Sequence, residues 1–272
     1  MSEDRVSITI TDGIADVRMT RADKRNALDN AMFSALADAG ERLKTEPGVR
    51  VVVLSGEGSS FCAGLDFATM SALAGGGERP ANSDGNPGEM KEGRITHLGQ
   101  QVCWVWQEVP VPVIAAVHGH ALGGGIQIAL GADIRIVHPD TQMSVREIHW
   151  GLVPDMSGTM TLSRLVRADV AKELVLTARV FDGREAHALG LATKLSETPY
   201  DDAMAMAREI AGRSPDAVRA GKALLNGLLN QGAAEQFSAE RHYIASLIGR
   251  PNQIEAVMSN FEKRPANFID PA

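Results

Sequence analysis

The 272-residue sequence has few cysteines, few aromatic residues and no long hydrophobic run. Its two cysteines, Cys62 and Cys103, are too few for a disulfide framework and too far apart for a metal-binding knuckle. Aromatic residues make up 4% of the chain and the formal net charge is −7. A nucleic-acid partner is therefore not expected, because it requires positive charge and stacking surfaces. No stretch approaches the roughly 18 apolar residues of a membrane span, so we expect no membrane insertion.

Several motifs of known chemistry are also absent. The sequence contains no Walker loop, no GxGxxG after a strand, no GxSxG elbow and no HExxH. His118 and His120 alternate, but no third ligand follows nearby, so we expect no metal site. The first residues, MSEDRVSITI, are polar and acidic and contain no signal-peptide core. These absences predict a soluble cytoplasmic protein.

What is present centres on residues 113–133, VIAAVHGHALGGGIQIALGAD. Val113–Val117 has the length and apolar character of a buried strand, and the apolar residues after the glycines at 123–125 predict a short buried helix. Glycines let backbone approach closely, and the free N–H groups at the start of a helix favour a negative oxygen. The stretch therefore predicts either a tight packing turn or a preorganised oxyanion site.

A second glycine-containing junction covers residues 60–66, SFCAGLD. Ala63 and Gly64 keep its backbone bare, and a short helix starting near Leu65 would again offer free N–H groups. An oxyanion hole needs at least two donors that converge on one oxygen, so two such junctions are more informative than one. Asp66, in the first turn, either compensates the helix dipole or takes part in a site.

The remaining pattern predicts one α/β chain. Alternating apolar residues predict a β-hairpin over residues 6–19, and Asp29 is a suitable cap for the helix that follows. We expect a core over residues 1–200 and a helical region over residues 201–272, which would cover the core and serve in assembly. Residues 74–93 predict a long loop, which is either a lid or plain disorder.

Two carboxylates flank a predicted turn in REIHWGLVPD. Glu147 follows an apolar strand, so it should be partly buried with a raised pKa, which suits proton transfer near neutral pH. The alternative is an ion pair between Glu147 and Arg146 or Arg164. Asp155 is either a second proton carrier or a helix cap.

Five motifs in order resemble one family. They are RADKRNALD, SFCAGLD, VHGHALGGGIQIALGAD, REIHWGLVPD and FEKRPANF. The chain resembles the crotonase superfamily, that is, enoyl-CoA hydratases and isomerases. The resemblance implies an α/β spiral of ββα units with a helical C-terminal trimerisation region, assembled as a homotrimer or hexamer. It also implies an acyl-CoA thioester as the substrate and no cofactor.

The resemblance implies roles for individual residues. The backbone N–H groups of Leu65 and Gly124 would hold the thioester oxygen. Arg21, Lys24 and Arg25 form a basic loop in RADKRNALD, which on its own would be an ordinary solvated surface loop. This basic loop matches the part of the family that meets the nucleotide of CoA. Contacts with CoA are implied for Lys24, Arg25, Ala63, Asp66 and Lys263.

The carboxylates distinguish the subfamilies. Hydratases of the family carry two glutamates, and the first falls at Gln127, which cannot exchange protons with water. Glu147 matches the second. Asp155 matches an aspartate of dienoyl-CoA isomerases, although those enzymes have another aspartate at the Gln127 position. Double-bond isomerisation by Glu147 and Asp155 fits better than hydration. An alternative of another class is an acyl-CoA-binding protein with little turnover.

Overall fold

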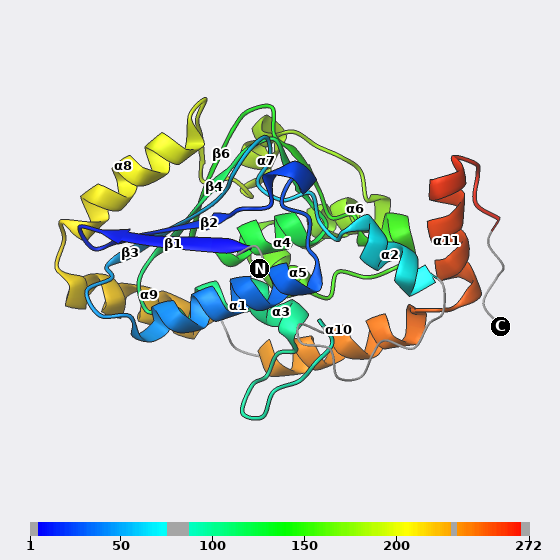
Figure 1. Ribbon diagram of the computed structural model, residues 1–272, viewed down its shortest axis with the longest axis horizontal. Coiled ribbons are helices and arrows are strands. Elements are labelled where there is room, and N and C mark those ends of the chain that lie inside the picture. The colour runs from blue at the N-terminus through cyan, green and yellow to red at the C-terminus, as the bar shows by residue number, and fades with distance from the viewer. Residues whose placement is uncertain (1–4, 75–86, 230–232, 268–272) are drawn as a thin grey trace.

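A six-stranded sheet forms the centre of the fold (Figure 1). The computed structural model describes residues 5–74, 87–229 and 233–267, so most of the predicted 74–93 loop lies outside the described residues. The first two strands are antiparallel and the other neighbours are parallel. In spatial order the strands are β1 (Val6–Thr11), β2 (Ile14–Met19), β3 (Val51–Gly56), β4 (Val113–Val117), β6 (Ile134–Val137) and β8 (Lys194–Leu195).

The N-terminal hairpin is confirmed. Its two-residue turn consists of Asp12 and Gly13, both with positive φ (52° and 80°), so the twist of the turn matches that of the strands. Two further short strands, β5 (His120–Leu122) and β7 (Gln142–Ser144), pair in parallel beside the main sheet.

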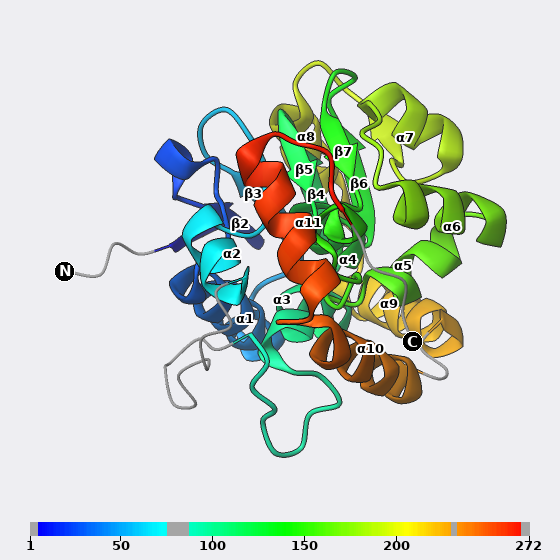
Figure 2. The same cartoon turned by 90° about the vertical axis from the view of Figure 1, so that its right-hand side faces the viewer.

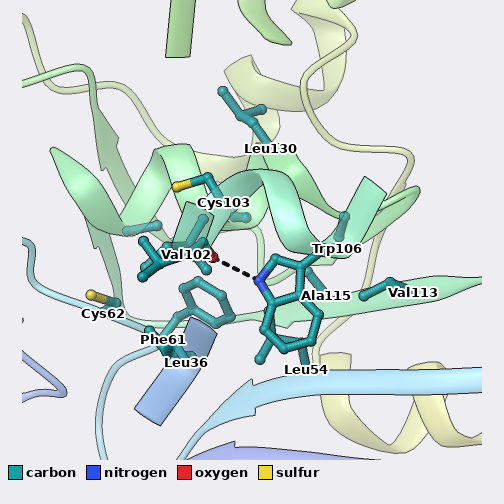
Figure 3. Close-up of a cluster of buried hydrophobic side chains, with 14 of the residues drawn as sticks. Leu36, Leu54, Phe61, Cys62, Val102, Cys103, Trp106, Val113, Ala115 and Leu130 are labelled. Carbon is teal, nitrogen blue, oxygen red and sulfur yellow. Dashed lines mark hydrogen bonds between the residues drawn. The ribbon is translucent and has the colours of Figure 1, made fainter. Parts of the chain in front are cut away.

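Helices cover both faces of the sheet, which is why its central strands are apolar throughout. One face packs against α1 (Asn30–Thr45), α3 (Leu98–Glu108) and α4 (Gly124–Gly131). Asp29 caps α1 as predicted, since its carboxylate accepts from the Met32 N–H at 2.9 Å. In Figure 3, Trp106 of α3 lies in this core and donates to the Val102 carbonyl at 2.9 Å.

The opposite face is covered by α8 (Pro199–Ala211), whose alanines pack against alternate residues of β3 and β4. All regular elements described beyond α8 are helices: α9 (Pro215–Leu229), α10 (Ala233–Leu247) and α11 (Pro251–Glu262). Smaller helices connect the core: η1 (Ala22–Lys24), α2 (Phe67–Ala74), η2 (Glu147–Trp150), α5 (Gly158–Leu165), α6 (Ala168–Thr177) and α7 (Gly183–Leu189). None of the described helices is long and apolar enough to cross a membrane.

Two of the C-terminal helices, α10 and α11, lie on the side of the molecule where α2 also lies (Figure 2). α11 packs against α2 and η2, and α10 contacts α5. In a small cluster at the start of α10, Phe237 packs edge-on against Trp104 of α3 with ring centroids 4.8 Å apart. α10 and α11 thus pack onto the core. Its predicted role in a trimer or hexamer stays a prediction.

A buried ion pair ties α9 to the sheet. Lys222 donates to the Asp133 carboxylate at 2.7 Å and to the carbonyls of Trp106 and Val111 at 2.8 and 3.0 Å. Burial raises the pKa of Asp133 and lowers the pKa of Lys222, and in each case the attraction of the partner opposes the shift. Removal of either side chain would therefore leave the charge of the other without its partner, which lowers the free energy of unfolding.

Replacing Lys222 with methionine should lower the free energy of unfolding by about 3 kcal/mol or more, because it leaves the Asp133 carboxylate buried without its counter-ion. Urea denaturation measures the loss. The matched control is Lys194→Met, since the Lys194–Asp202 pair has a similar 2.9 Å separation but is exposed. That control should cost at most about 1 kcal/mol. Equal effects of the two substitutions would contradict the prediction.

Candidate active site

The two glycine-containing junctions predicted from the sequence lie side by side. Cys62 and Ala121 form an isolated parallel bridge, and the Leu122 N–H donates to the Cys62 carbonyl at 3.1 Å. A Cβ atom on Gly64 would lie 2.6 Å from the Leu122 carbonyl oxygen, and one on Gly125 would lie 2.2 Å from the Cys62 carbonyl oxygen. Only glycine permits such an approach of two backbones.

Each junction contributes to the cavity one residue whose backbone N–H forms no backbone hydrogen bond in the described chain. The Leu28 N–H bonds to the Gly64 carbonyl and the Asp66 N–H to the Leu28 carbonyl, so the N–H of Leu65 between them points away from Leu28. Gly124 is the first residue of α4, where an N–H has no partner within the helix. Within the described chain neither N–H donates to another backbone group, and both residues line one cavity.

Gln127 of α4 holds the side chain of Glu147. The Gln127 amide oxygen accepts from the N–H groups of Met156 and Gly158 at 3.1 and 3.0 Å. Because the oxygen is engaged there, the amide nitrogen is directed at Glu147 Oε1, 2.5 Å away. Gln127 is fully buried and is not among the residues that line the cavity, whereas Glu147 is. The geometry makes Gln127 a positioning residue for Glu147.

Glu147 has the electrostatic character that the sequence predicted. Burial raises its pKa to about 7; the nearby charge of Asp155 adds to the shift, while hydrogen bonds from the backbone and Gln127 oppose it. Its Oε2 atom is buried and has no hydrogen-bond partner in the described part of the chain. A carboxyl group with a pKa near neutrality can accept a proton in one step and return it in the next.

This pKa predicts an acid limb near neutral pH. We expect kcat/KM to fall about tenfold per pH unit below a pKa near 7, because Glu147 must be ionised to take a proton from carbon. Steady-state rates between pH 5 and 9 give the profile. An acid limb at pH 4 to 5 would instead mean that Glu147 keeps its ordinary pKa, and would contradict the prediction.

The structure bears on both structural alternatives for the carboxylates. Glu147 forms no salt bridge with Arg146 or Arg164 among the described residues. The N-cap residue of α5 is Ser157, whose side chain makes no capping hydrogen bond, so Asp155 is not itself the N-cap residue. Asp155 lies two residues before this cap, is partly buried and lines the same cavity as Glu147. The structure thus brings both carboxylates to one space.

The basic loop reaches the cavity through a strained turn. Lys24 and Arg25 are exposed and line the cavity, and Arg25 and Asn26 both have positive φ (50° and 55°). The Asn26 side chain is fully buried and donates to the carbonyls of Glu57 and Ser60 at 3.0 and 2.8 Å. Sequence reasoning missed Asn26; the asparagine in the turn was its only signal, because asparagine tolerates positive φ.

Ala63 and Asp66 also line the cavity, but the Asp66 carboxylate is engaged. The N–H of Ala63 bonds to the Arg25 carbonyl at 2.9 Å, which joins the basic loop to the second junction. Asp66 accepts from the Ala68 N–H at the start of α2 and from Arg21 at 2.7 Å. Partial burial works to raise the pKa of Asp66, but these two partners outweigh it and the pKa is lowered. Asp66 therefore stays ionised and fixes the loop.

Lys263 lies elsewhere. It ends α11 in the left-handed conformation (φ 54°), is exposed, and is not among the residues that line this cavity. Its implied contact with CoA stays a prediction. His118 and His120 bond to Gly58 and Ser60, at 3.0 and 2.9 Å, as expected for histidines that pack near the turn.

The cavity is large and part of its lining is apolar. Its volume is about 1580 Å³. The apolar residues come from α2, η2, α10 and the segments next to them, and they include Leu65, Met70, Trp150, Leu152, Ile244 and Ile248. The sequence predicted that the C-terminal helices cover the core, but it did not identify which of their residues reach the site. A cavity lined both by exposed cations and by apolar side chains fits a molecule with an anionic end and a hydrocarbon end.

Comparison with known proteins agrees with this geometry. A family model for enoyl-CoA hydratase/isomerase matches residues 9–271. The chain is 33% identical over 264 residues to enoyl-CoA hydratase domain-containing protein 2 of Mus musculus, with 94% of this chain and 84% of that protein covered. It is 30% identical over 274 residues to the crotonyl-CoA hydratase of Syntrophomonas wolfei, with 99% of each covered.

A solved structure shows the same fold. An enoyl-CoA hydratase/isomerase from Pseudoalteromonas atlantica superposes with a TM-score of 0.85 at 25% identity, with 97% of this chain and 100% of that chain covered. The predicted α/β crotonase-like fold class is confirmed by this match and by the largely parallel sheet.

Proposed function

Because the chain belongs to the enoyl-CoA hydratase/isomerase family, we propose that it moves a carbon–carbon double bond along the acyl chain of an enoyl-CoA or dienoyl-CoA thioester. The observation that carries this proposal is the arrangement of Gln127. Its amide is held by Met156 and Gly158 and faces Glu147, so the cavity contains Glu147 and Asp155 as its proton carriers.

The reaction moves one proton and needs no added water. Glu147 takes a proton from the carbon next to the thioester of a 3-enoyl-CoA, and the electron pair passes to the thioester oxygen as an enolate. The N–H groups of Leu65 and Gly124 stabilise that oxygen, a contribution worth about 10²–10³ in rate for one donor. Glu147 then returns this proton at the fourth carbon, directly or by passing it through Asp155, which gives the 2-enoyl-CoA and restores both carboxylates. Atoms and charge balance over the two steps.

CoA itself would lie along the basic loop. We propose that Lys24 and Arg25 meet its nucleotide end and that the backbone at Ala63 and Asp66 runs beside the adenine and pantetheine. Two observations support this: these residues line the cavity, and Lys24 and Arg25 are its exposed cations. Lys and Arg side chains bind phosphate through charge-assisted hydrogen bonds.

A second candidate is hydration of a 2-enoyl-CoA, which the name of the Syntrophomonas relative favours. Glu147 would then activate a water molecule without a second carboxylate at residue 127. Hydratases of the family hold the water between two glutamates, and here the first of these positions is Gln127. We place hydration second because this second carboxylate is missing. The acyl-CoA-binding alternative predicts that no product forms with any chain length.

The two reactions are separated by following them independently. We expect conversion of 3-enoyl- and 3,5-dienoyl-CoA, with deuterium from D₂O entering the product, to exceed water addition to 2-enoyl-CoA. Asp155→Asn should slow isomerisation by about 10²-fold or more, since one of two proton carriers is lost. Asp140→Asn, an exposed aspartate on the surface, is the matched control. Fast hydration that survives Asp155→Asn would overturn the isomerase proposal in favour of the hydratase.

A further inference from the structure

One arginine in the cavity wall has no role in the chemistry described above. Arg241 of α10 is partly buried and lines the cavity together with Ile244 and Ala245 of the same helix and with Ile248, which follows it. Its Nη1 atom donates to the Ile95 carbonyl at 2.9 Å and to Gln100 Oε1 at 3.0 Å. Both acceptors are neutral. No carboxylate of the described chain forms a salt bridge with Arg241, and that includes Glu147 and Asp155.

The guanidinium is held by a rigid partner. Gln100 is fully buried in the first turn of α3, and its Oε1 also accepts from the His97 N–H at 3.2 Å. Its Nε2 donates to the Phe237 carbonyl of α10 at 3.0 Å. Gln100 therefore fixes both the helix that carries Arg241 and the direction of its side chain. A guanidinium held in place by neutral partners keeps its charge available for an anion in the cavity.

The helix that carries Arg241 and the basic loop lie on opposite sides of α2. In Figures 1 and 2 the dark blue turn at residues 21–25 lies above α2, and α10 lies below it. A thioester with its nucleotide at Lys24 and Arg25 and its carbonyl at the two junctions would therefore extend its acyl chain toward α10. The apolar wall of Met70, Leu152 and Ile248 lines that space.

We propose that the acyl group carries a carboxylate at its far end and that Arg241 binds it. The inference rests on the proposed function and names its substrate class, the monothioesters of dicarboxylic acids. A guanidinium matches a carboxylate through two parallel N–H···O bonds, which an apolar chain end cannot use. Arg146, another cavity-lining cation, directly precedes Glu147 and is placed near the reacting carbons rather than at the chain end.

Binding of saturated thioesters tests this inference apart from turnover. Calorimetry would compare adipoyl-CoA with hexanoyl-CoA and suberoyl-CoA with octanoyl-CoA, pairs that differ only in the terminal carboxylate. We expect the dicarboxylic member of at least one pair to bind the wild type about 10- to 100-fold more tightly. Arg241→Met should abolish that preference, and Arg241→Lys should keep part of it. Arg213→Met, which removes an exposed arginine paired with Glu209, is the control for net charge.

Each outcome decides the question. Selective loss of dicarboxylic binding in Arg241→Met, with hexanoyl-CoA binding unchanged, supports the site. Equal loss of both ligands would assign Arg241 to holding α10 and would overturn it, as would a wild type without preference. Since saturated thioesters can be neither isomerised nor hydrated, a preference in binding stands even if no double-bond migration is found. Failure of the proposed function is thus distinguishable from failure of the inference.

Discussion

Glu147→Gln should lower kcat by about 10²–10⁴-fold with little change in acyl-CoA affinity, because it removes the main proton carrier and preserves the shape of the side chain. The glutamine can still accept the hydrogen bond from Gln127, so the site should stay assembled. Steady-state kinetics and calorimetry with a saturated acyl-CoA separate the two effects. Glu197→Gln, an exposed carboxylate that pairs with His138, is the control and should leave both unchanged. A variant with near-normal turnover would remove Glu147 from the mechanism.

The same substitution should stabilise the protein at alkaline pH. The pKa of Glu147 in the folded chain, about 7, lies above its ordinary value of 4.5. The folded state therefore binds this proton more tightly than the unfolded state, so the stability that the group contributes is present below pH 4.5 and is lost as the pH rises through 7. Glutamine carries no charge to bury. The Tm of Glu147→Gln should exceed that of the wild type at pH 8 but not at pH 4.5. A gain of equal size at both pH values would contradict the raised pKa of Glu147 in the folded chain.

Gly64→Ala should cost about 10²–10³ in kcat, the effect of losing one oxyanion donor. Gly64 has φ of +89°, and a methyl group there would lie 2.6 Å from the Leu122 carbonyl oxygen. The Leu122 carbonyl oxygen is a backbone atom and cannot move aside as the end of a flexible side chain can. The two junctions must therefore move apart, which shifts the Leu65 N–H relative to the Gly124 N–H. Rates with the best thioester substrate measure the loss.

Gly48→Ala is the matched control for this substitution. Gly48 has a nearly equal positive φ of +78°, but nothing lies within 4 Å of its added Cβ. Both variants pay the conformational cost of alanine at positive φ, about 1 kcal/mol of stability. Only Gly64→Ala should also lose activity in the folded protein. Comparable kcat values for the two variants would mean that the junctions do not form the oxyanion site.

Local chemistry explains why much of the fold was predictable. The 6–19 hairpin, the Asp29 cap and the buried runs of β3 and β4 follow from periodicity, turn residues and capping, which act over a few neighbouring residues. The starts of α9 and α11 at Pro215 and Pro251 follow in the same way from the fixed φ of proline, which suits the first turn of a helix. Glu147 was predicted as a partly buried acid with a raised pKa because it follows an apolar strand, and both features are confirmed.

Contacts between distant residues were not predictable. The resemblance assigned Gln127 to the water-holding position, and only tertiary contacts show its amide turned to Glu147 by the backbone of Met156 and Gly158. Asp155 was considered as a helix cap, but the N-cap residue of α5 is Ser157, two residues further along the chain. The ion pair considered for Glu147 is not formed in the described residues, since Arg164 lies instead over the Trp104 ring, 5.6 Å from its centroid.

The amino-acid sequence by itself determined the elements, the two bare glycine junctions and the acidic residue that follows β7, because each depends on steric and hydrogen-bonding preferences of adjacent residues. Tertiary structure alone decided that the junctions abut, that Gln127 faces Glu147, and that Arg241 reaches the cavity from a helix 94 residues beyond Glu147. Which distant groups meet depends on how whole helices pack around the sheet, and no local preference encodes that arrangement.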